Sequence, residues 1–185
     1  MSLILAIETG TDICSVGIAK DGELLSLRES DEGRDHARKV GVFVDELLRE
    51  TDIAPDELDA VAVGKGPGSY TGLRIGVSFA KGLCYGLQKP LVAVGSLDAL
   101  AEVVDAGSFA AFRGQGRPFV IFGSGARKCA GILSDAVCVE VTPSARGLAR
   151  LAQQALDEGC TEDIAYFEPF YLKDFVVTTS RKKLF

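Results

Sequence analysis

The sequence lacks several features on which whole classes of protein depend. Its 185 residues include a single histidine, His36, which excludes any mechanism that needs two imidazoles. No C-x-x-C pair occurs among the five widely spaced cysteines, a pattern typical of reduced thiols rather than of disulfides or structural zinc: Cys14, Cys84, Cys129, Cys138 and Cys160. The longest apolar run is the five residues from Leu3 to Ile7, whereas a membrane helix needs about 20. No basic stretch precedes that run, so we expect neither a membrane span nor a signal peptide.

Positive charge is also in short supply. Lys and Arg number 20 against 26 Asp and Glu, which gives a net charge of −6. Such a chain repels phosphate overall and is by itself a poor candidate for tight nucleic-acid binding. With 47% apolar and 25% charged residues the composition is that of a globular protein, and the length fits one domain or two small lobes.

Hydrophobic patterning predicts the order β-β-β-α-β-α-β-α over the first hundred residues. We expect strands at 3–7, 13–19, 23–29, 60–64 and 91–94, with the turn signal Asp21-Gly22 between the second and third. Helices are predicted at 36–50, 71–87 and 97–104, with Asp35 and Ser96 as N-caps and a short turn at Pro55. A meander followed by alternating helices implies a mixed sheet with helices on its faces.

The signal weakens after residue 104. The sequence there predicts a short helix at 108–113, strands at 118–122 and 137–141 around a turn at 123–125, and a helix over 144–158. The stretch 167–185 reads as irregular with a basic end. Arg181-Lys182-Lys183 has the charge to touch RNA phosphate, but simple solvation of such a terminus is the favoured interpretation.

A glycine-rich loop stands between the strand at 60–64 and the helix that follows it. Its candidate ligand residues are Gly66, Gly68 and Ser69, because backbone N–H groups at a helix N-terminus can bind an anion. The spacing matches neither a P-loop nor G-x-G-x-x-G, and a tight turn with close helix packing is the favoured alternative. The helix also holds four glycines, at about 1 kcal/mol each relative to Ala, which indicates something packed close to its backbone: Gly72, Gly76, Gly82 and Gly86.

Two further polar clusters have both a chemical and an ordinary interpretation. Glu8 and Thr9 follow the first strand, where actin-like and sugar-kinase ATPases hold nucleotide phosphates and magnesium; ordinary hairpin chemistry is favoured here. Asp35-His36 opens a helix, but a catalytic histidine needs a nucleophile and an orienting group nearby. A surface histidine near a helix N-terminus is therefore the favoured interpretation.

Three long strings of the sequence resemble the TsaB (YeaZ) family: ILAIETGTDICSVGI, HARKVGVFVDELL and AVAVGKGPGSYTGLRIGVSFAKGL. The segment Pro169 to Lys173 is similar to that family's Pro-x-Tyr-Leu-Arg ending. The resemblance implies an actin-like ATPase (ribonuclease H-like) α/β fold. Residues 1–104 would form the N-terminal lobe, and 105–185 a shortened second lobe with the C-terminal tail. A stretch of the second lobe is expected to be missing at about Val104/Asp105, which leaves a nucleotide cleft between lobes in doubt.

The resemblance also implies a function and partners. TsaB is the non-catalytic partner of TsaD, which transfers threonylcarbamoyl to the adenosine beside the anticodon, and of the ATPase TsaE. We therefore expect a cytoplasmic scaffold or activator without a cofactor, a homodimer when alone, that meets tRNA only through its complex. The family's helix interface maps onto eight residues of this chain: Val40, Phe43, Val44, Leu47, Gly72, Arg74, Gly76 and Phe79.

The resemblance also implies that the metal ligands of the catalytic paralogue are replaced in this chain. The catalytic paralogue has two metal-binding histidines four residues apart, and the matching positions here hold Ser96 and Leu100. Leucine has no lone pair and neutral serine is a poor ligand, so we expect neither a metal site nor catalytic residues. Two rivals remain: an ATP-dependent transferase or kinase-like enzyme that uses residues 8–11 and 65–69 on phosphates, and a simple homodimeric module outside tRNA modification.

Overall fold

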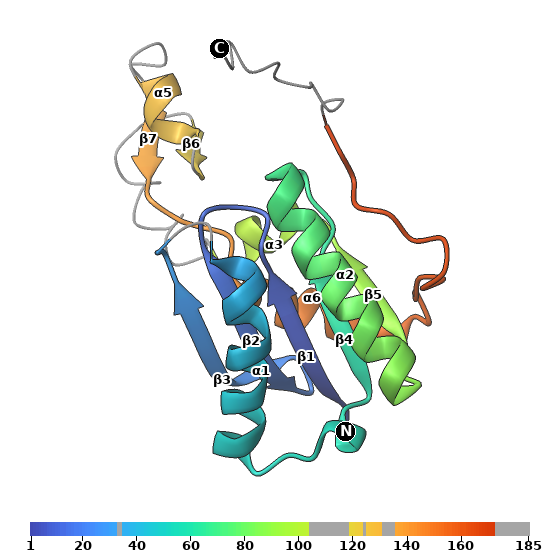
Figure 1. Ribbon diagram of the computed structural model, residues 1–185. Helices are drawn as coiled ribbons and strands as arrows, with labels where there is room; N and C mark the ends of the chain where they lie inside the picture. The colour runs from blue at the N-terminus through green and yellow to red at the C-terminus, as the bar shows by residue number, and fades with distance from the viewer. Residues whose placement is uncertain (33–34, 104–118, 124, 131–135, 173–185) are drawn as a thin grey trace, which may run out of the picture.

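A five-stranded sheet with helices on both faces forms the body of the protein, as a computed structural model shows (Figure 1). The structure describes residues 1–32, 35–103, 119–123, 125–130 and 136–172. The strand order is β3-β2-β1-β4-β5. The strands are β1 (Leu3–Glu8), β2 (Cys14–Lys20), β3 (Glu23–Ser30), β4 (Ala60–Gly64) and β5 (Leu91–Val94).

The sheet is antiparallel on one side and parallel on the other, which confirms the predicted mixed sheet. β1 pairs with β2 from Leu3 opposite Lys20, and β2 pairs antiparallel with β3. Asp21 and Gly22 both have positive φ, as the tight turn between these strands requires. β1, β4 and β5 run parallel, so their carboxyl ends meet at one edge of the sheet. The loops that follow these three strands are therefore brought together.

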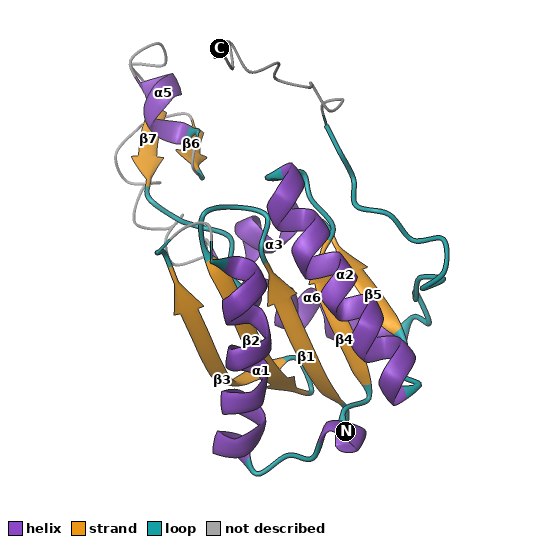
Figure 2. Cartoon of the chain, viewed as in Figure 1, coloured by secondary structure: helices purple, strands orange, loops and turns teal. Residues whose placement is uncertain are grey.

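Two long helices cover one face of the sheet and two others cover the opposite face (Figure 2). α1 (His36–Thr51) and α2 (Tyr70–Leu87) pack over a core that includes Leu5, Val16 and Val63. α3 (Ser96–Val103) and α6 (Ala145–Asp157) close the other face. α6 belongs to the C-terminal part of the sequence, yet it packs on the sheet built by the N-terminal part.

A small second sheet lies beyond the carboxyl ends of the main strands (Figure 1). It consists of β6 (Phe119–Phe122), paired in parallel with β7 (Ala136–Val139), and the short α5 (Ala126–Ala130) between them. The helix predicted at 108–113, the Val104/Asp105 junction and Arg181 to Lys183 lie outside the described residues. None of the described helices is long and apolar enough to cross a membrane.

The predicted elements match the observed ones within about two residues, but one of the two predicted helix caps is wrong. Asp35 is the N-cap of α1, as predicted, although its side chain makes no capping bond and pairs with Arg38 at the surface. Ser96 lies inside α3 as its first residue, and its hydroxyl points into the protein. The turn predicted at Pro55 is a 3-10 helix, η1 (Pro55–Glu57).

Candidate functional site

The two loops that the sequence singled out meet at the carboxyl ends of the parallel strands. The backbone N–H of Ser69 donates to the carbonyl of Gly10 at 2.6 Å, which joins the loop before α2 to the turn after β1. A Cβ atom at Gly68 would collide with the backbone of Gly10. Thus the candidate ligand residues lie in one cluster, as the fold requires: Glu8, Thr9, Gly66, Gly68 and Ser69.

Glu8 is the buried centre of this cluster. One carboxylate oxygen accepts from the backbone N–H of Gly10 at 2.6 Å, and the other accepts from the Ser96 hydroxyl at 2.9 Å. The Ser96 hydroxyl in turn accepts from the backbone N–H of Gly66 at 3.2 Å. Burial raises the pKa of the Glu8 carboxyl above its usual value, while the hydrogen bonds from Gly10 and Ser96 oppose that rise. The carboxylate thus joins three loops, which is more than the hairpin role favoured from the sequence.

Thr9 fixes the position of α2. Its hydroxyl donates to the carbonyl of Gly72 at 2.8 Å. A Cβ at Gly72 would collide with the Thr9 carbonyl, and one at Gly76 with the Thr9 hydroxyl. These two glycines are needed because the turn after β1 packs directly against the helix backbone. The close approach predicted from the glycine-rich helix is therefore confirmed here, but its partner is the chain's own turn.

Two cavities flank the joined loops. One, of about 370 Å³, lies between the loop backbones at Gly10 and Gly68 and the apolar side chains of Leu97, Leu100 and Phe122. The other, of about 410 Å³, lies between the N-terminal ends of α1 and α2 and includes Thr11, His36 and Thr71. Asp12 lines both cavities, and its carboxylate would oppose an anionic ligand in either one.

His36 is buried, which corrects the prediction of a surface histidine. Its Nε2 lies 2.7 Å from the carbonyl oxygen of Thr11, and only 7% of the residue is exposed. The first turn of α1 thereby holds the end of the turn that follows β1. The histidine serves as a packing and hydrogen-bonding residue between these two elements.

Five of the eight predicted interface residues are not available to a partner. Val40, Val44 and Leu47 of α1 are buried against the sheet, and Gly72 and Gly76 of α2 are buried against Thr9. Their placement on a partner surface is therefore wrong. The apolar stripes of the two helices are the faces that cover their own sheet.

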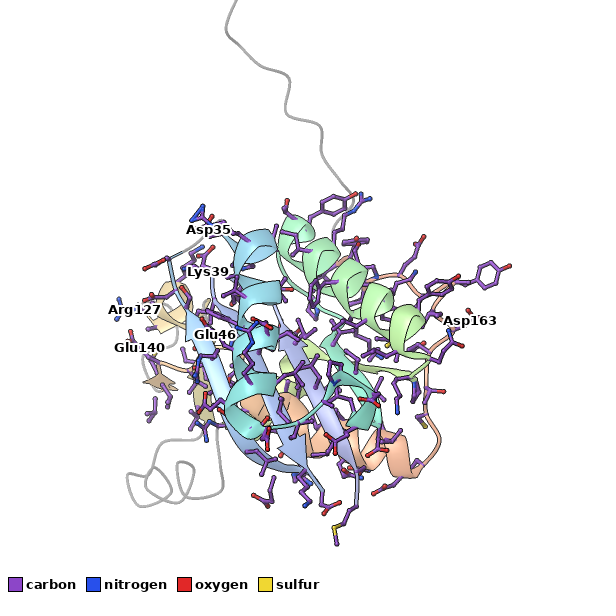
Figure 3. All side chains as sticks on the ribbon, turned by 60° about the horizontal axis from the view of Figure 1, so that its bottom comes forward. Asp35, Lys39, Glu46, Arg127, Glu140 and Asp163 are labelled. Atoms are coloured by element: carbon purple, nitrogen blue, oxygen red, sulfur yellow. The ribbon has the colours of Figure 1, made fainter. Side chains whose placement is uncertain are left out.

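The remaining predicted residues lie nearer the surface. Phe43 and Phe79 are half-buried against the same core, and Arg74 is exposed. The free face of α2 instead carries Gly82 and Gly86, which have no heavy atom within 4 Å of an added Cβ. Figure 3 shows Asp35, Lys39 and Glu46 on α1, with Lys39 and Glu46 on the flank toward β3, where they pair with Glu32 and Arg28.

The positions that the resemblance assigns to metal-binding histidines have other roles here. Ser96 takes part in the Glu8 network, and Leu100 is buried. No group of three or more His, Cys, Asp or Glu residues with metal-binding geometry occurs within the described part of the chain.

The C-terminal strap, by which we mean residues 162–172, was not predicted from the sequence. The strap runs antiparallel to α2: the N–H of Glu162 donates to the carbonyl of Leu91, and the N–H of Phe170 donates to the carbonyl of Lys65. The Lys81 side chain donates to the Phe167 carbonyl at 3.0 Å. Backbone hydrogen bonds leave no side-chain periodicity, so only the resemblance of 169–173 to the family ending marked this segment.

The family model that matches the chain is TsaD, described as tRNA N6-adenosine threonylcarbamoyltransferase, over residues 30–140. A Haemophilus influenzae protein named tRNA threonylcarbamoyladenosine biosynthesis protein TsaB is 35% identical over 99 residues, which is 54% of this chain and 42% of that protein. A tRNA N6-adenosine threonylcarbamoyltransferase from Nitratidesulfovibrio vulgaris is 38% identical over 52% of this chain and 31% of its own length. The chain thus matches less than half the length of these curated relatives.

Solved structures agree with these relatives. YeaZ from Pseudomonas aeruginosa has a TM-score of 0.75 at 25% identity, covering 93% of this chain and all of that one. RuvC from Thermus thermophilus, at 14% identity and a TM-score of 0.50 over 88% of this chain and 99% of its own, shares the fold alone. Together with the mixed sheet, these similarities confirm the actin-like (ribonuclease H-like) fold expected from the sequence.

Proposed function

Because this chain belongs to the TsaB (YeaZ) family, within the wider group that TsaD represents, we propose that it is a non-catalytic subunit in the formation of threonylcarbamoyladenosine on tRNA. In this role it binds and activates a TsaD-like catalytic paralogue. A TsaE-like ATPase joins the complex, and tRNA binds to the assembled complex. The modification takes place in the cytoplasm. Alone, the chain forms a homodimer.

The observation that carries the non-catalytic role is the buried Glu8 network. In open α/β sheets, ligands bind outside the carboxyl ends of parallel strands, and here that crevice holds the chain's own carboxylate. The N–H groups of Gly10 and Gly66 that face it are engaged with Glu8 and Ser96. Ser96 and Leu100 supply no metal ligand beside it. The site is therefore built to hold its own loops in place.

We propose that the partner surface is the outer face of α1 and α2 rather than their apolar stripes. Arg74, Gly82 and Gly86 lie on this face of α2, bordered by half-buried Phe43 and Phe79. Each exposed glycine costs the isolated helix about 1 kcal/mol relative to Ala and touches nothing in this chain. A helix backbone that is left bare allows a partner helix to approach closely.

The test is reconstitution of tRNA modification from purified components with and without this chain. We expect modification to require the chain and Gly82→Leu to weaken binding to the paralogue at least about tenfold, or about 1.4 kcal/mol. Gly125→Leu is the matched control, since Gly125 is also an exposed glycine without neighbours but lies next to α5. Full modification in the absence of the chain would refute the proposed function.

One observation favours the rival, an ATP-dependent transferase or kinase-like enzyme. The two candidate phosphate loops do converge, beside a cavity of about 370 Å³. This rival requires magnesium-dependent nucleotide binding by the purified chain. Calorimetry with ATP and magnesium decides between the two, because the scaffold role predicts no heat of binding.

A further inference from the structure

The groove between α2 and the C-terminal strap combines positive charge with aromatic rings. It has a volume of about 310 Å³, and its lining includes Arg74 and Lys81 from α2 and Tyr171 from the strap. The rings of Tyr70 and Tyr171 lie 4.7 Å apart, and the Arg74 guanidinium lies 5.5 Å from the centre of the Tyr70 ring. Besides its backbone hydrogen bonds, the strap packs Ile164 and Phe167 against the core, while Tyr171 lines the groove.

Large apolar side chains gather at this flank. Of the eight exposed large hydrophobic residues among those the structure describes, four lie on the strap or on the adjoining part of α2: Tyr85 at 71%, Tyr166 at 84%, Phe170 at 53% and Leu172 at 70%. Figure 3 shows Asp163, which begins this flank, at the edge of the molecule opposite the Arg127 and Glu140 pair. Three of the four are aromatic rings, and no other part of the described surface collects them.

The charge of the chain is distributed unevenly along the sequence. The whole chain carries a net charge of −6, but the thirteen residues that follow Leu172 contain four basic residues, Lys173 and Arg181 to Lys183, against one acidic residue, Asp174. These thirteen residues follow the strap directly in the sequence and carry a net charge of +3. Such an asymmetry is typical of a local contact with a polyanion.

We propose that the groove between α2 and the C-terminal strap binds an RNA strand with unpaired bases. This inference rests on the proposed function, which supplies an RNA substrate, and it gives the chain a direct contact that the scaffold role does not require. Arg74 and Lys81 would pair with phosphates, and bases would stack on a ring that lines the groove, Tyr171. Glu168 lines the same groove and opposes the contact, since its carboxylate repels phosphate.

Because Arg74 and Glu168 carry opposite charges in the groove, their removal should change the RNA affinity in opposite directions. We would measure fluorescence anisotropy of a labelled unpaired RNA oligonucleotide with the full-length chain, at two salt concentrations. Arg74→Ala is expected to weaken binding and to lower the salt slope by about 0.7 for the lost phosphate contact. Tyr171→Ala should weaken binding at least about fivefold through lost stacking. Glu168→Gln should tighten binding at low salt, an effect that a structural role of this residue would not produce.

A control variant at another exposed arginine distinguishes RNA binding in the groove from the proposed scaffold role. Arg49→Ala removes an exposed arginine of α1 that pairs with Asp45 and does not line the groove, and it should leave RNA binding unchanged. Equal affinity of all variants, or no measurable binding by the wild type, overturns the inference; if reconstituted modification still requires the chain, the proposed function stands. Weaker binding of the groove variants to the catalytic paralogue, without any change in RNA affinity, would identify a protein contact and also overturn the inference.

Discussion

Glu8 is a buried residue whose ionisation the fold resists. Its folded-state pKa is raised from 4.5, first by burial, so the folded protein holds this proton more tightly than the unfolded chain. The contribution to stability is therefore fully present below pH 4.5 and is lost as the pH rises through the folded pKa. Glu8→Gln should remove this loss. We expect the variant to gain stability relative to wild type as the pH increases above 4.5 in urea unfolding.

Glu32 provides the control of opposite sign. Lys39 lowers the pKa of its exposed carboxyl through a side-chain hydrogen bond, so the ionised form is favoured in the fold. Glu32→Gln should lose stability at neutral pH and converge with wild type in acid. If the Glu8→Gln difference did not grow with pH, the raised pKa would be contradicted.

Two glycines of α2 differ in what lies next to them, and alanine substitutions at the two should have opposite effects on stability. Gly76→Ala places a methyl group against the Thr9 hydroxyl and should destabilise the protein by about 1–3 kcal/mol. Gly82→Ala meets no neighbour and should stabilise it by up to about 1 kcal/mol through helix propensity. Chemical denaturation of the two variants checks both signs, and equal effects would show that Thr9 does not hold the helix.

The sequence identified the right glycines but not what packs against them. Helix propensity alone shows that Gly72 and Gly76 are unfavourable, and hence that something lies close. Whether that something is a partner helix or the turn after β1 depends on a contact across 63 residues of sequence, from Thr9 to Gly72. A still larger separation, 88 residues, hid the bond from Ser96 to Glu8.

Among the elements, α3 and α6 cross at close range. A Cβ at Gly147 would collide with the carbonyl of Ala99, so the two helices pack backbone to backbone. Gly147→Ala should push α6 away from α3 and the sheet and cost about 1–3 kcal/mol, although alanine favours the helix. Thermal unfolding checks this, with Gly125→Ala as the control that has no neighbour to displace. An unchanged transition temperature for Gly147→Ala would contradict the tight crossing.

Strands and helices were predictable because each has its own periodicity. The buried strand β4 matches its predicted range of 60–64, and α1 differs from its prediction by one residue at its end. Periodicity shows which face of α1 is apolar but not what covers it, and so Val40, Val44 and Leu47 were assigned to a partner rather than to the sheet. The strap has neither period, and its backbone bonds and the packing of Ile164 and Phe167 follow no pattern in the sequence, so its path was not predicted.

Two buried thiols report on whether the sheet and the helices of the whole molecule unfold together. Cys14 of β2 and Cys84 of α2 belong to the same core between the sheet and the helices. Burial raises the pKa of both thiols from 9.0 to about 11, which lowers the reactive thiolate fraction about a hundredfold at neutral pH. Cys138 on β7 and Cys160 after α6 are exposed.

These positions predict a two-stage labelling pattern with a thiol reagent. Cys138 and Cys160 should react in the native protein, whereas Cys14 and Cys84 should react only on global unfolding, because a strand and a helix of one core must open together. Mass spectrometry of each cysteine along a urea series measures this, and we expect Cys14 and Cys84 to share one midpoint. Distinct midpoints for the two would show that α2 separates from the sheet before the sheet unfolds. The outer face of α2 would then belong to a mobile helix, which is a poor platform for a partner.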